Sequence, residues 1–245
     1  MIACEILFRE ACYCAALCDP IIDIQFMKKG LHDIGAEKMS GKLQQAIDEV
    51  STDEYDAILL CYGLCNNGIS SLHGKLPIVI PRAHDCITLL LGSKERYKEY
   101  FDNNPGTYFK SSGWIERDAS LDGEEADSSV MNQLGLGKSY EDYVELYGEE
   151  NADYIAEILG NWEENYTKMT FINTKLGNID LDRSISKEAA ETKQWDFEEV
   201  EGDIRLILKL MNGQWDEDEF LVIPGGDKIV PSNDEKIVKH TRLRE

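Results

Sequence analysis

Three cysteines and a histidine follow two short apolar runs of the sequence, and these residue types bind metals. Cys61 ends the first run and Cys65 comes four residues later, whereas His84 and Cys86 follow the second run, residues 78–80. Thiolate and imidazole groups are ligands of zinc and of iron–sulfur clusters. Ligand sites collect at the carboxyl ends of parallel strands, so both runs would deliver these side chains to one sheet edge. The sequence therefore predicts a metal or cluster site at that edge.

The pair formed by Cys61 and Cys65 is ambiguous by itself. Three intervening residues let both thiols face one centre across a turn or one helical turn, and Gly63 allows the chain to bend tightly. The alternative interpretation is that Cys61 ends a buried strand and that Cys65 is an ordinary loop thiol. The second segment favours metal binding, because His84 and Cys86 would reach the same edge.

Neighbouring residues are candidates for holding a cofactor or substrate. Arg82 could bind a carboxylate or phosphate, or form a surface ion pair. Gly63 and Asn66 belong to a glycine- and asparagine-rich turn whose backbone amides could approach a ligand. Cys86 begins a predicted helix, and a helix N-terminus lowers the pKa of a thiol. A catalytic pair of one of these cysteines with His84 is a further alternative, but no oxyanion-hole motif supports hydrolysis.

The other four cysteines lie in the first 18 residues. Cys4 is part of the first predicted strand and reaches the site only if that strand is central; packing is the alternative. Cys12, Cys14 and Cys18 lie on a predicted helix, where Cys14 and Cys18 are one turn apart and share a face, as a pair of metal ligands could. We interpret these three as packing residues.

Composition limits the classes of function. The 245 residues carry a formal net charge of −22, which opposes binding to nucleic acid or to an anionic membrane surface. No stretch is long enough to span a bilayer, and the N-terminus lacks the features of a signal peptide. We therefore expect a cytoplasmic protein. Its seven cysteines are then mostly reduced, which points to metal, cluster or redox chemistry rather than to disulfides.

Apolar runs alternate with helical patterns along the chain, which predicts an α/β fold. We expect mostly parallel strands flanked by helices, as one sheet or as two Rossmann-like lobes. An acidic segment rich in Gly and Ser, residues 116–138, separates a lobe at 1–115 from a second α/β portion at 139–245. The predicted strands are 2–8, 21–26, 57–61, 78–80, 169–173, 198–201 and 220–223, and the predicted helices are 10–17, 40–50, 84–101, 140–147, 152–166, 184–192 and 203–210.

Three segments of the sequence carry a resemblance to a known family. They read Cys-Tyr-Gly-Leu-Cys-Asn-Asn-Gly from residue 61, Pro-Arg-Ala-His-Asp-Cys-Ile-Thr-Leu-Leu-Leu-Gly-Ser from residue 81, and Pro-Gly-Thr-Tyr-Phe-Lys-Ser-Ser-Gly-Trp from residue 105. Together with the opening Ala-Cys-Glu-Ile-Leu-Phe-Arg-Glu, they resemble the domain-of-unknown-function family 1638. The resemblance covers most of the chain, and the His-Asp-Cys segment is its most specific part.

The resemblance implies a biochemical setting but no reaction. Members of this family occur in anaerobic archaea and bacteria, often beside corrinoid-dependent methyltransferases that act on methylamines and related compounds. At the positions that match the family pattern, the resemblance implies that Cys4, Cys61, Cys65, His84 and Cys86 are metal ligands. The cysteines at 12, 14 and 18 are additions to the family pattern.

Two hypotheses of different classes follow. In the first, the chain is a methyltransferase or redox accessory factor of one-carbon metabolism, with zinc or an iron–sulfur cluster at the strand ends. Zinc suits a soft nucleophile, whereas a cluster suits one-electron chemistry such as the reduction of an inactive corrinoid. In the second, it is a non-catalytic binding or chaperone module for a corrinoid protein or its cofactor, and the cysteines are structural. Oligomerisation is compatible with both.

Overall fold

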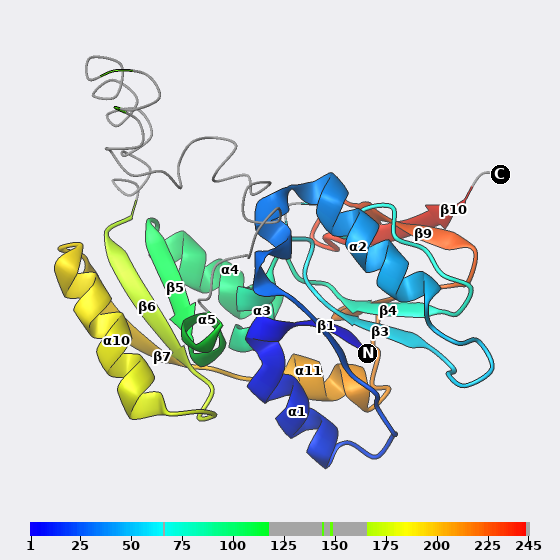
Figure 1. Ribbon diagram of the computed structural model, residues 1–245, viewed down its shortest axis with the longest axis horizontal. Helices are drawn as coiled ribbons and strands as arrows, with labels where there is room; N and C mark the ends of the chain where they lie inside the picture. The colour runs from blue at the N-terminus through cyan, green and yellow to red at the C-terminus, as the bar shows by residue number, and fades with distance from the viewer. Residues whose placement is uncertain (66, 118–143, 145–147, 149–165, 244–245) are drawn as a thin grey trace.

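The structure is a computed structural model that describes residues 1–65, 67–117, 144, 148 and 166–243. Two sheets lie side by side in Figure 1, with helices packed around and between them. The described part of the chain therefore has the α/β architecture that the sequence predicts, with parallel strands flanked by helices. Among the described helices, none has the length and apolar character needed to cross a bilayer.

The first sheet has five strands in the order β2-β1-β3-β4-β8. Strands β1 to β4 run parallel, and β8 pairs antiparallel with β4 at one edge. The strands are β1 (Ile2–Cys4), β2 (Gln25–Met27), β3 (Ile58–Cys61), β4 (Ile78–Pro81) and β8 (Phe220–Ile223). Strands β3 and β4 are buried along their whole length, which explains their unbroken apolar sequence.

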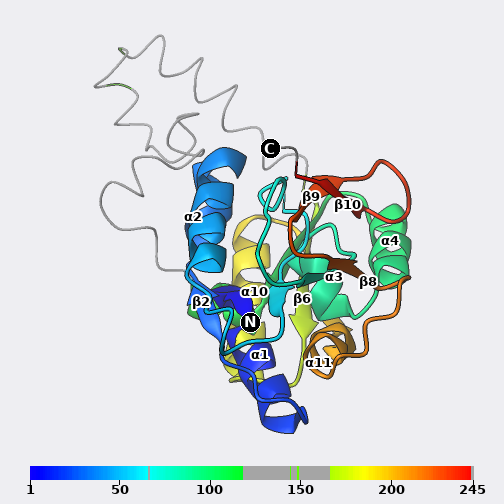
Figure 2. The same cartoon turned by 90° about the vertical axis from the view of Figure 1, so that its right-hand side faces the viewer.

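Helices cover both faces of the first sheet, as Figure 2 shows. Alternate strand residues pack on opposite faces: Ile58 and Leu60 join a core with α2 (Ala36–Asp48), whereas Leu59 and Cys61 join a core with α1 and α11. Helix α1 spans Phe8–Leu17 and α11 spans Arg205–Met211. Short 3-10 helices η1 (Glu5–Leu7) and η2 (Lys29–Ile34) follow β1 and β2.

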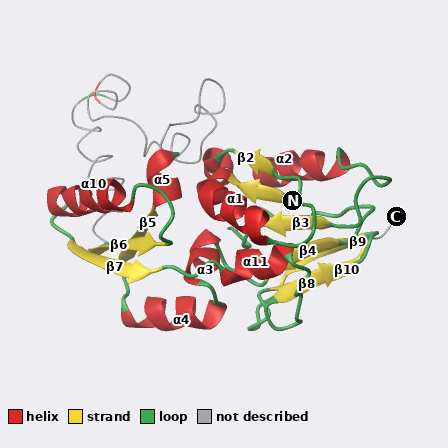
Figure 3. Cartoon of the chain, turned by 90° about the horizontal axis from the view of Figure 1, so that it is seen from below, coloured by secondary structure: helices red, strands yellow, loops and turns green. Residues whose placement is uncertain are grey.

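The second sheet is parallel and has the order β5-β6-β7. Helices α10 and α4 lie on its two faces, as seen in Figure 3. The Tyr100 hydroxyl of α4 contacts Thr170 and Glu198 on this sheet, at 2.6 and 2.8 Å. The elements are β5 (Thr107–Ser111), β6 (Lys168–Asn173), β7 (Asp196–Glu201), α4 (Lys94–Asn103) and α10 (Ile179–Thr192).

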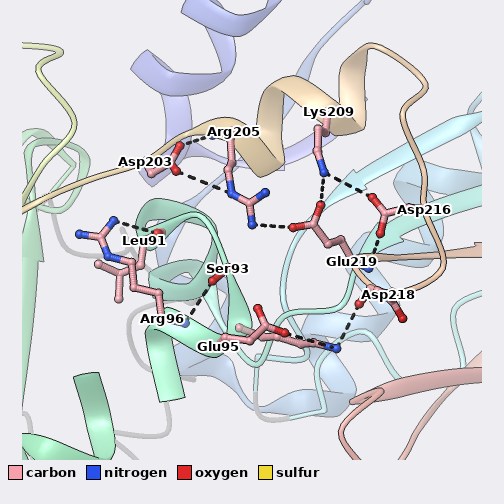
Figure 4. A network of polar contacts seen from close by, with 11 residues as sticks. Leu91, Ser93, Glu95, Arg96, Asp203, Arg205, Lys209, Asp216, Asp218 and Glu219 are labelled. Atoms are coloured by element: carbon pink, nitrogen blue, oxygen red, sulfur yellow. Dashed lines mark hydrogen bonds and ion pairs between the residues drawn. The ribbon is translucent and has the colours of Figure 1, made fainter. Parts of the chain in front are cut away.

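The chain returns from the second sheet to the first after β7, and charged contacts fix this crossing (Figure 4). The Asp203 amide donates to the Leu90 carbonyl at 2.8 Å. The Arg205 guanidinium pairs with Glu219 at 2.6 Å, and Lys209 also contacts Glu219. These contacts attach the crossing to α3 (Cys86–Leu91) and to the segment before β8. The chain ends in an antiparallel hairpin of β9 (Asp227–Pro231) and β10 (Val238–Arg242).

Several predicted boundaries differ from the structure. The predicted strand 2–8 ends at Cys4, and the predicted helix 84–101 is two helices. Gly92 adopts a left-handed φ of 86° that ends α3, and the Ser93 side chain caps α4. Nearly all residues of the predicted helices 140–147 and 152–166, and of the acidic segment 116–138, lie outside the described residues. The lobe boundaries stay a prediction, although β5 belongs to the second sheet and β8 to the first.

Candidate functional site

Four cysteines border one cavity of about 290 Å³ at the carboxyl edge of the first sheet. Cys4 and Cys61 are the last residues of β1 and β3, Cys65 lies in the turn after β3, and Cys86 is the first residue of α3. Parallel pairing places Cys61 opposite Ala3, next to Cys4. The structure thus brings together four of the five residues that the sequence indicates as metal ligands. We call this space the thiol cavity.

Two backbone hydrogen bonds align the segments that carry Cys65 and Cys86. The Leu64 amide donates to the Ala83 carbonyl at 2.8 Å, and the Cys65 amide donates to the His84 carbonyl at 2.9 Å. Gly63 permits this approach, because a Cβ atom at that position would lie 2.5 Å from the Asp85 amide nitrogen. Gly63 also lines the thiol cavity, and its predicted part in binding a cofactor stays a prediction.

Burial raises the pKa of all four cavity thiols and so favours their protonated form. Desolvation raises the pKa of Cys4 to about 11 and that of Cys65 to about 12. It also raises the pKa of Cys61 and Cys86, and the negative charge of Asp85 adds to the effect on Cys86. The prediction that the helix N-terminus lowers the pKa of Cys86 is therefore wrong, because desolvation outweighs the field of a six-residue helix.

Two polar residues at the thiol cavity were missed by the sequence reasoning. Tyr62 is only 4% exposed and its hydroxyl lies beside the Cys4 thiol. Asp85 accepts the amides of Ile87 and Thr88 at 3.0 and 3.2 Å and thereby caps α3. The N-cap pattern of an aspartate before an apolar helix could have revealed Asp85, whereas nothing in the sequence distinguishes Tyr62 from a core aromatic residue.

The remaining wall of the thiol cavity is largely apolar, with two cations. Lys28 and Lys29 also border it, and the Lys29 ammonium lies 5.0 Å from the centre of the Trp114 ring. Trp114 comes from α5 (Ser112–Glu116), which directly follows strand β5 of the second sheet. The cavity therefore lies where the two sheets approach each other. The apolar wall residues are Ile6, Leu7, Leu31, Met39, Ile87 and Trp114.

His84 does not lie with the thiols. Its side chain is exposed, its ring centre is 6.2 Å from that of Tyr97, and it lines a separate surface pocket with Lys94 and Phe101. The ring and the Cys86 thiol leave the loop in different directions, although only one residue separates them. The prediction that His84 joins the cysteines as a ligand has no support from this arrangement.

The candidates for binding a cofactor or substrate fall in different places. Arg82 is buried and donates to the backbone carbonyls of Glu217, Lys236 and Val238 at 2.6–2.8 Å. These bonds attach the end of β4 to the C-terminal hairpin, so they indicate a structural role, and ligand binding by Arg82 stays a prediction. Asn66 lies outside the described residues.

Cys12, Cys14 and Cys18 do not border the thiol cavity. Cys14 is fully buried in the core, Cys12 is exposed, and Cys18 is partly buried. Within the described ranges, no three or more Cys, His, Asp or Glu side chains are grouped closely enough to hold a metal ion. The four cavity thiols thus surround a space rather than meeting at one point.

A comparison with known families matches residues 26–211 to the family described as "Protein of unknown function (DUF1638)". The matched range contains Cys61, Cys65, His84 and Cys86 and begins after Cys4. No curated protein and no solved structure matches the chain. Since the match spans well over half of the 245 residues, the chain belongs to the DUF1638 family.

Proposed function

We propose that this protein binds an iron–sulfur cluster through Cys4, Cys61, Cys65 and Cys86. The observation that carries the proposal is that four cysteines from different elements border one cavity of about 290 Å³. Cysteine thiolates are the usual ligands of such clusters, which take four of them. The three segments that supply these thiols are fixed to one another by strand pairing and by loop hydrogen bonds.

The arrangement of the thiols favours a cluster over a single zinc ion. A structural zinc ion needs four ligands that converge on one point, with sulfur ligands at about 2.3 Å. Within the described residues, no three Cys, His, Asp or Glu side chains are grouped closely enough to hold a metal ion. A cluster has several metal atoms, so its ligands stand farther apart around a larger space. The cavity has the volume of roughly ten water molecules at about 30 Å³ each, which is far more than one metal ion occupies.

The surroundings of the thiols suit a redox centre that is shielded from water. Ligation requires each thiol to release its proton, and Lys28 and Lys29 beside the cavity offset the negative charge that results. Burial and hydrogen bonds to sulfur are the means by which a protein sets the potential of a cluster. When bound, a cluster would supply one-electron chemistry at the edge of the first sheet.

The family resemblance adds a biochemical setting to this proposal. We infer that the protein acts in the cytoplasm, near corrinoid-dependent methyl transfer in one-carbon metabolism. In that setting a one-electron carrier would serve as a redox accessory factor, and its partner would be a corrinoid protein or its methyltransferase.

A second candidate function is a non-catalytic module that binds or delivers a corrinoid protein or cofactor. The burial of the thiols favours it, because neutral cysteines pack as small hydrophobic residues. Cys61 has no exposed surface, and its side chain lies in the core with Leu59 and Val79. In this case the chain would fold fully and function without metal.

Anaerobic purification followed by metal analysis separates the two functions. The proposal predicts iron and acid-labile sulfide in stoichiometric amounts, with broad visible absorption, before or after reconstitution with ferrous iron and sulfide. A colourless protein with one zinc per chain would exclude the cluster. A folded chain that retains no metal after reconstitution would support the binding module instead.

A further inference from the structure

A second pocket, of about 390 Å³, lies beside the loop that carries His84 and Cys86. His84 borders this pocket, whereas Cys86 borders the thiol cavity. The remaining walls come from α4 and from the turn of the C-terminal hairpin, which contributes Glu235 and Ile237. The volume falls within the range of pockets that hold small molecules. We call this space the α4 pocket.

Three aromatic rings form a row along the α4 pocket. The ring centres of His84 and Tyr97 are 6.2 Å apart, and those of Tyr97 and Phe101 are 5.9 Å apart with only 20° between their planes. Tyr97 and Phe101 are one turn apart on α4, so they share a face of the helix. Phe101 is 49% exposed. A half-exposed ring at the end of such a row offers an apolar π face on which a further flat ring can stack.

The hairpin turn holds its wall of the pocket in a strained conformation. Ile237 is 2% exposed and has a left-handed φ of 64°, which a β-branched residue rarely adopts. Arg82 donates to the carbonyls of Lys236 and Val238, on either side of Ile237, at 2.8 and 2.6 Å. Such strain persists only where the surrounding contacts enforce it, and it clusters at binding sites. The pocket therefore has a wall that is fixed before any ligand binds.

The charged groups of the α4 pocket argue against an anionic ligand. Lys94 donates to the backbone carbonyls of Asp218 and Glu235 at 3.1 and 3.3 Å. Lys98 pairs with Asp102 at 2.5 Å. Both ammonium groups that border the pocket are thus already engaged. A phosphate group would also meet more negative than positive charge there, because three carboxylates border the same space. They belong to Glu95, Asp102 and Glu235.

We propose that the α4 pocket binds an uncharged planar heteroaromatic ring, such as the isoalloxazine ring of riboflavin. The flat ring extends the row of aromatic side chains beyond Phe101, where stacking replaces exposure to water. The imidazole nitrogens of His84 supply hydrogen-bonding groups for the polar edge of such a ring. Tyr97, in the middle of the row, donates to Asp85 at 3.0 Å, and Asp85 borders the thiol cavity. One hydrogen bond therefore connects the two sites, but ring binding does not require a cluster.

Quenching of riboflavin fluorescence by the metal-free chain tests the proposal. We expect saturable quenching at one riboflavin per chain, because an aromatic side chain that stacks on the ring quenches its emission. Phe101→Ala should weaken binding by about 5- to 100-fold, the usual effect of removing a stacking ring. Phe101→Trp should retain binding, because indole also offers a π face. The control is Tyr13→Ala in α1, which removes an aromatic side chain of similar exposure, 47%, that does not border the pocket.

Flavin mononucleotide separates the role of the ring from that of charge. Its phosphate should make binding weaker than that of riboflavin at low salt, and the difference should shrink as added salt screens the carboxylates. Quenching that does not saturate, or equal affinities of Phe101→Ala and Tyr13→Ala, would overturn the ring site. Tighter binding of the mononucleotide than of riboflavin would overturn the assignment to an uncharged ligand. Because the chain in these titrations carries no metal, a negative result leaves the proposed cluster standing.

Discussion

The two sheets present different chemistry at the same topological edge. In the first sheet, the carboxyl ends of β1 and β3 carry Cys4 and Cys61, which border the thiol cavity. In the second sheet, the strands β5, β6 and β7 end in Ser111, Asn173 and Glu201. All seven cysteines of the chain precede residue 87, so the second sheet contains none.

The polar groups at the second edge are engaged in structural contacts. The Ser111 hydroxyl accepts the Trp114 amide at 3.5 Å, and the Asn173 side chain donates to Glu199 at 2.7 Å. The hydroxyl of Thr174, directly after β6, donates to Glu10 of α1 at 2.6 Å. This edge supports α5 and α1, whereas the first edge leaves an open space lined with thiols. The comparison teaches that the same topological edge can serve packing in one sheet and surround a cavity with thiols in the other.

Cysteine replacements at the first edge should have the largest effect. We expect Cys61→Ser and Cys86→Ser each to abolish retention of iron and the visible absorption, because each removes one of four thiolate ligands. Iron and sulfide analysis after anaerobic reconstitution measures the outcome. If both variants retained all of their iron, the first edge would not bind a cluster through these cysteines, and the proposed difference between the two edges would be wrong.

Matched controls come from residues near the first sheet that do not border the cavity. Cys12→Ser and Cys18→Ser should keep the cluster, because neither side chain borders the cavity. His84→Ala should also keep it, since the His84 ring is exposed and lies beside Tyr97. Loss of iron from His84→Ala would instead support the prediction from the sequence that His84 is a metal ligand.

Alkylation of the metal-free chain should distinguish cavity thiols from the surface thiol. The thiolate is the reactive form, and burial raises the pKa of Cys4 to about 11 and of Cys65 to about 12. At pH 8 we expect iodoacetamide to modify exposed Cys12 at least roughly a hundredfold faster than either cavity residue. Between pH 8 and 10 the rates at the cavity should rise about tenfold per pH unit, because the thiolate fraction rises with pH well below the pKa.

Timed quenching and mass spectrometry of the alkylated peptides give the rate at each cysteine. Equal rates at Cys12 and Cys65 at pH 8 would show that the cavity is open to water and that its thiols are not desolvated. That result would also mean that the cavity thiols do not differ from the surface thiol in their exposure to water.

The sequence predicts which segments meet at the carboxyl edge of the first sheet better than it predicts which side chains line the cavity there. Buried apolar runs and the parallel-strand rule place Cys61 and Cys86 at one edge, because strand direction is a property of the whole segment. The direction of a single side chain depends on the turn that carries it, which is why the exposure of His84 could not be foreseen. The raised pKa of Cys86 was missed for a related reason, since it depends on the depth of burial.

A glycine substitution tests whether the two loops at the first edge must touch. In Gly63→Ala the new methyl group would lie 2.5 Å from the Asp85 amide nitrogen, and backbone atoms cannot move aside without displacing the segment that carries Cys86. We expect a loss of about 1–3 kcal/mol in the free energy of unfolding, with lower iron retention. Urea denaturation of the metal-free chain measures the first effect.

The control for this substitution is Gly41→Ala in α2, where a methyl group would meet nothing within 4 Å. It should stabilise the chain by roughly 0.5–1 kcal/mol, because alanine favours a helix over glycine. If Gly63→Ala behaved like Gly41→Ala, the close packing of the two loops would have no role in the site.

A substitution in the second sheet should have the smallest effect, and it should change only the stability of the fold. Glu198 of β7 accepts from the Tyr100 hydroxyl at 2.8 Å and from the Lys168 ammonium at 3.0 Å. The bond from Tyr100 is the main reason that its pKa lies below the ordinary value of 4.5, and the bond and positive charge of Lys168 add to it. A lowered carboxyl pKa stabilises the fold above the pKa of the unfolded chain, and this stabilisation disappears as pH falls through the folded pKa.

We therefore expect Glu198→Gln to lower the free energy of unfolding at pH 7 by less than about 1 kcal/mol, since its side chain is 40% exposed and water screens the pair. The deficit should shrink as pH falls below 4.5 and the wild-type carboxylate takes up its proton. Urea denaturation at pH 7 and at pH 3.5 measures both values, and exposed Glu188→Gln is the matched control.

Iron retention should not change in Glu198→Gln, because Glu198 does not border the thiol cavity. Loss of iron in this variant would mean that the second sheet contributes to the site, and that the two edges are not as separate as their chemistry indicates.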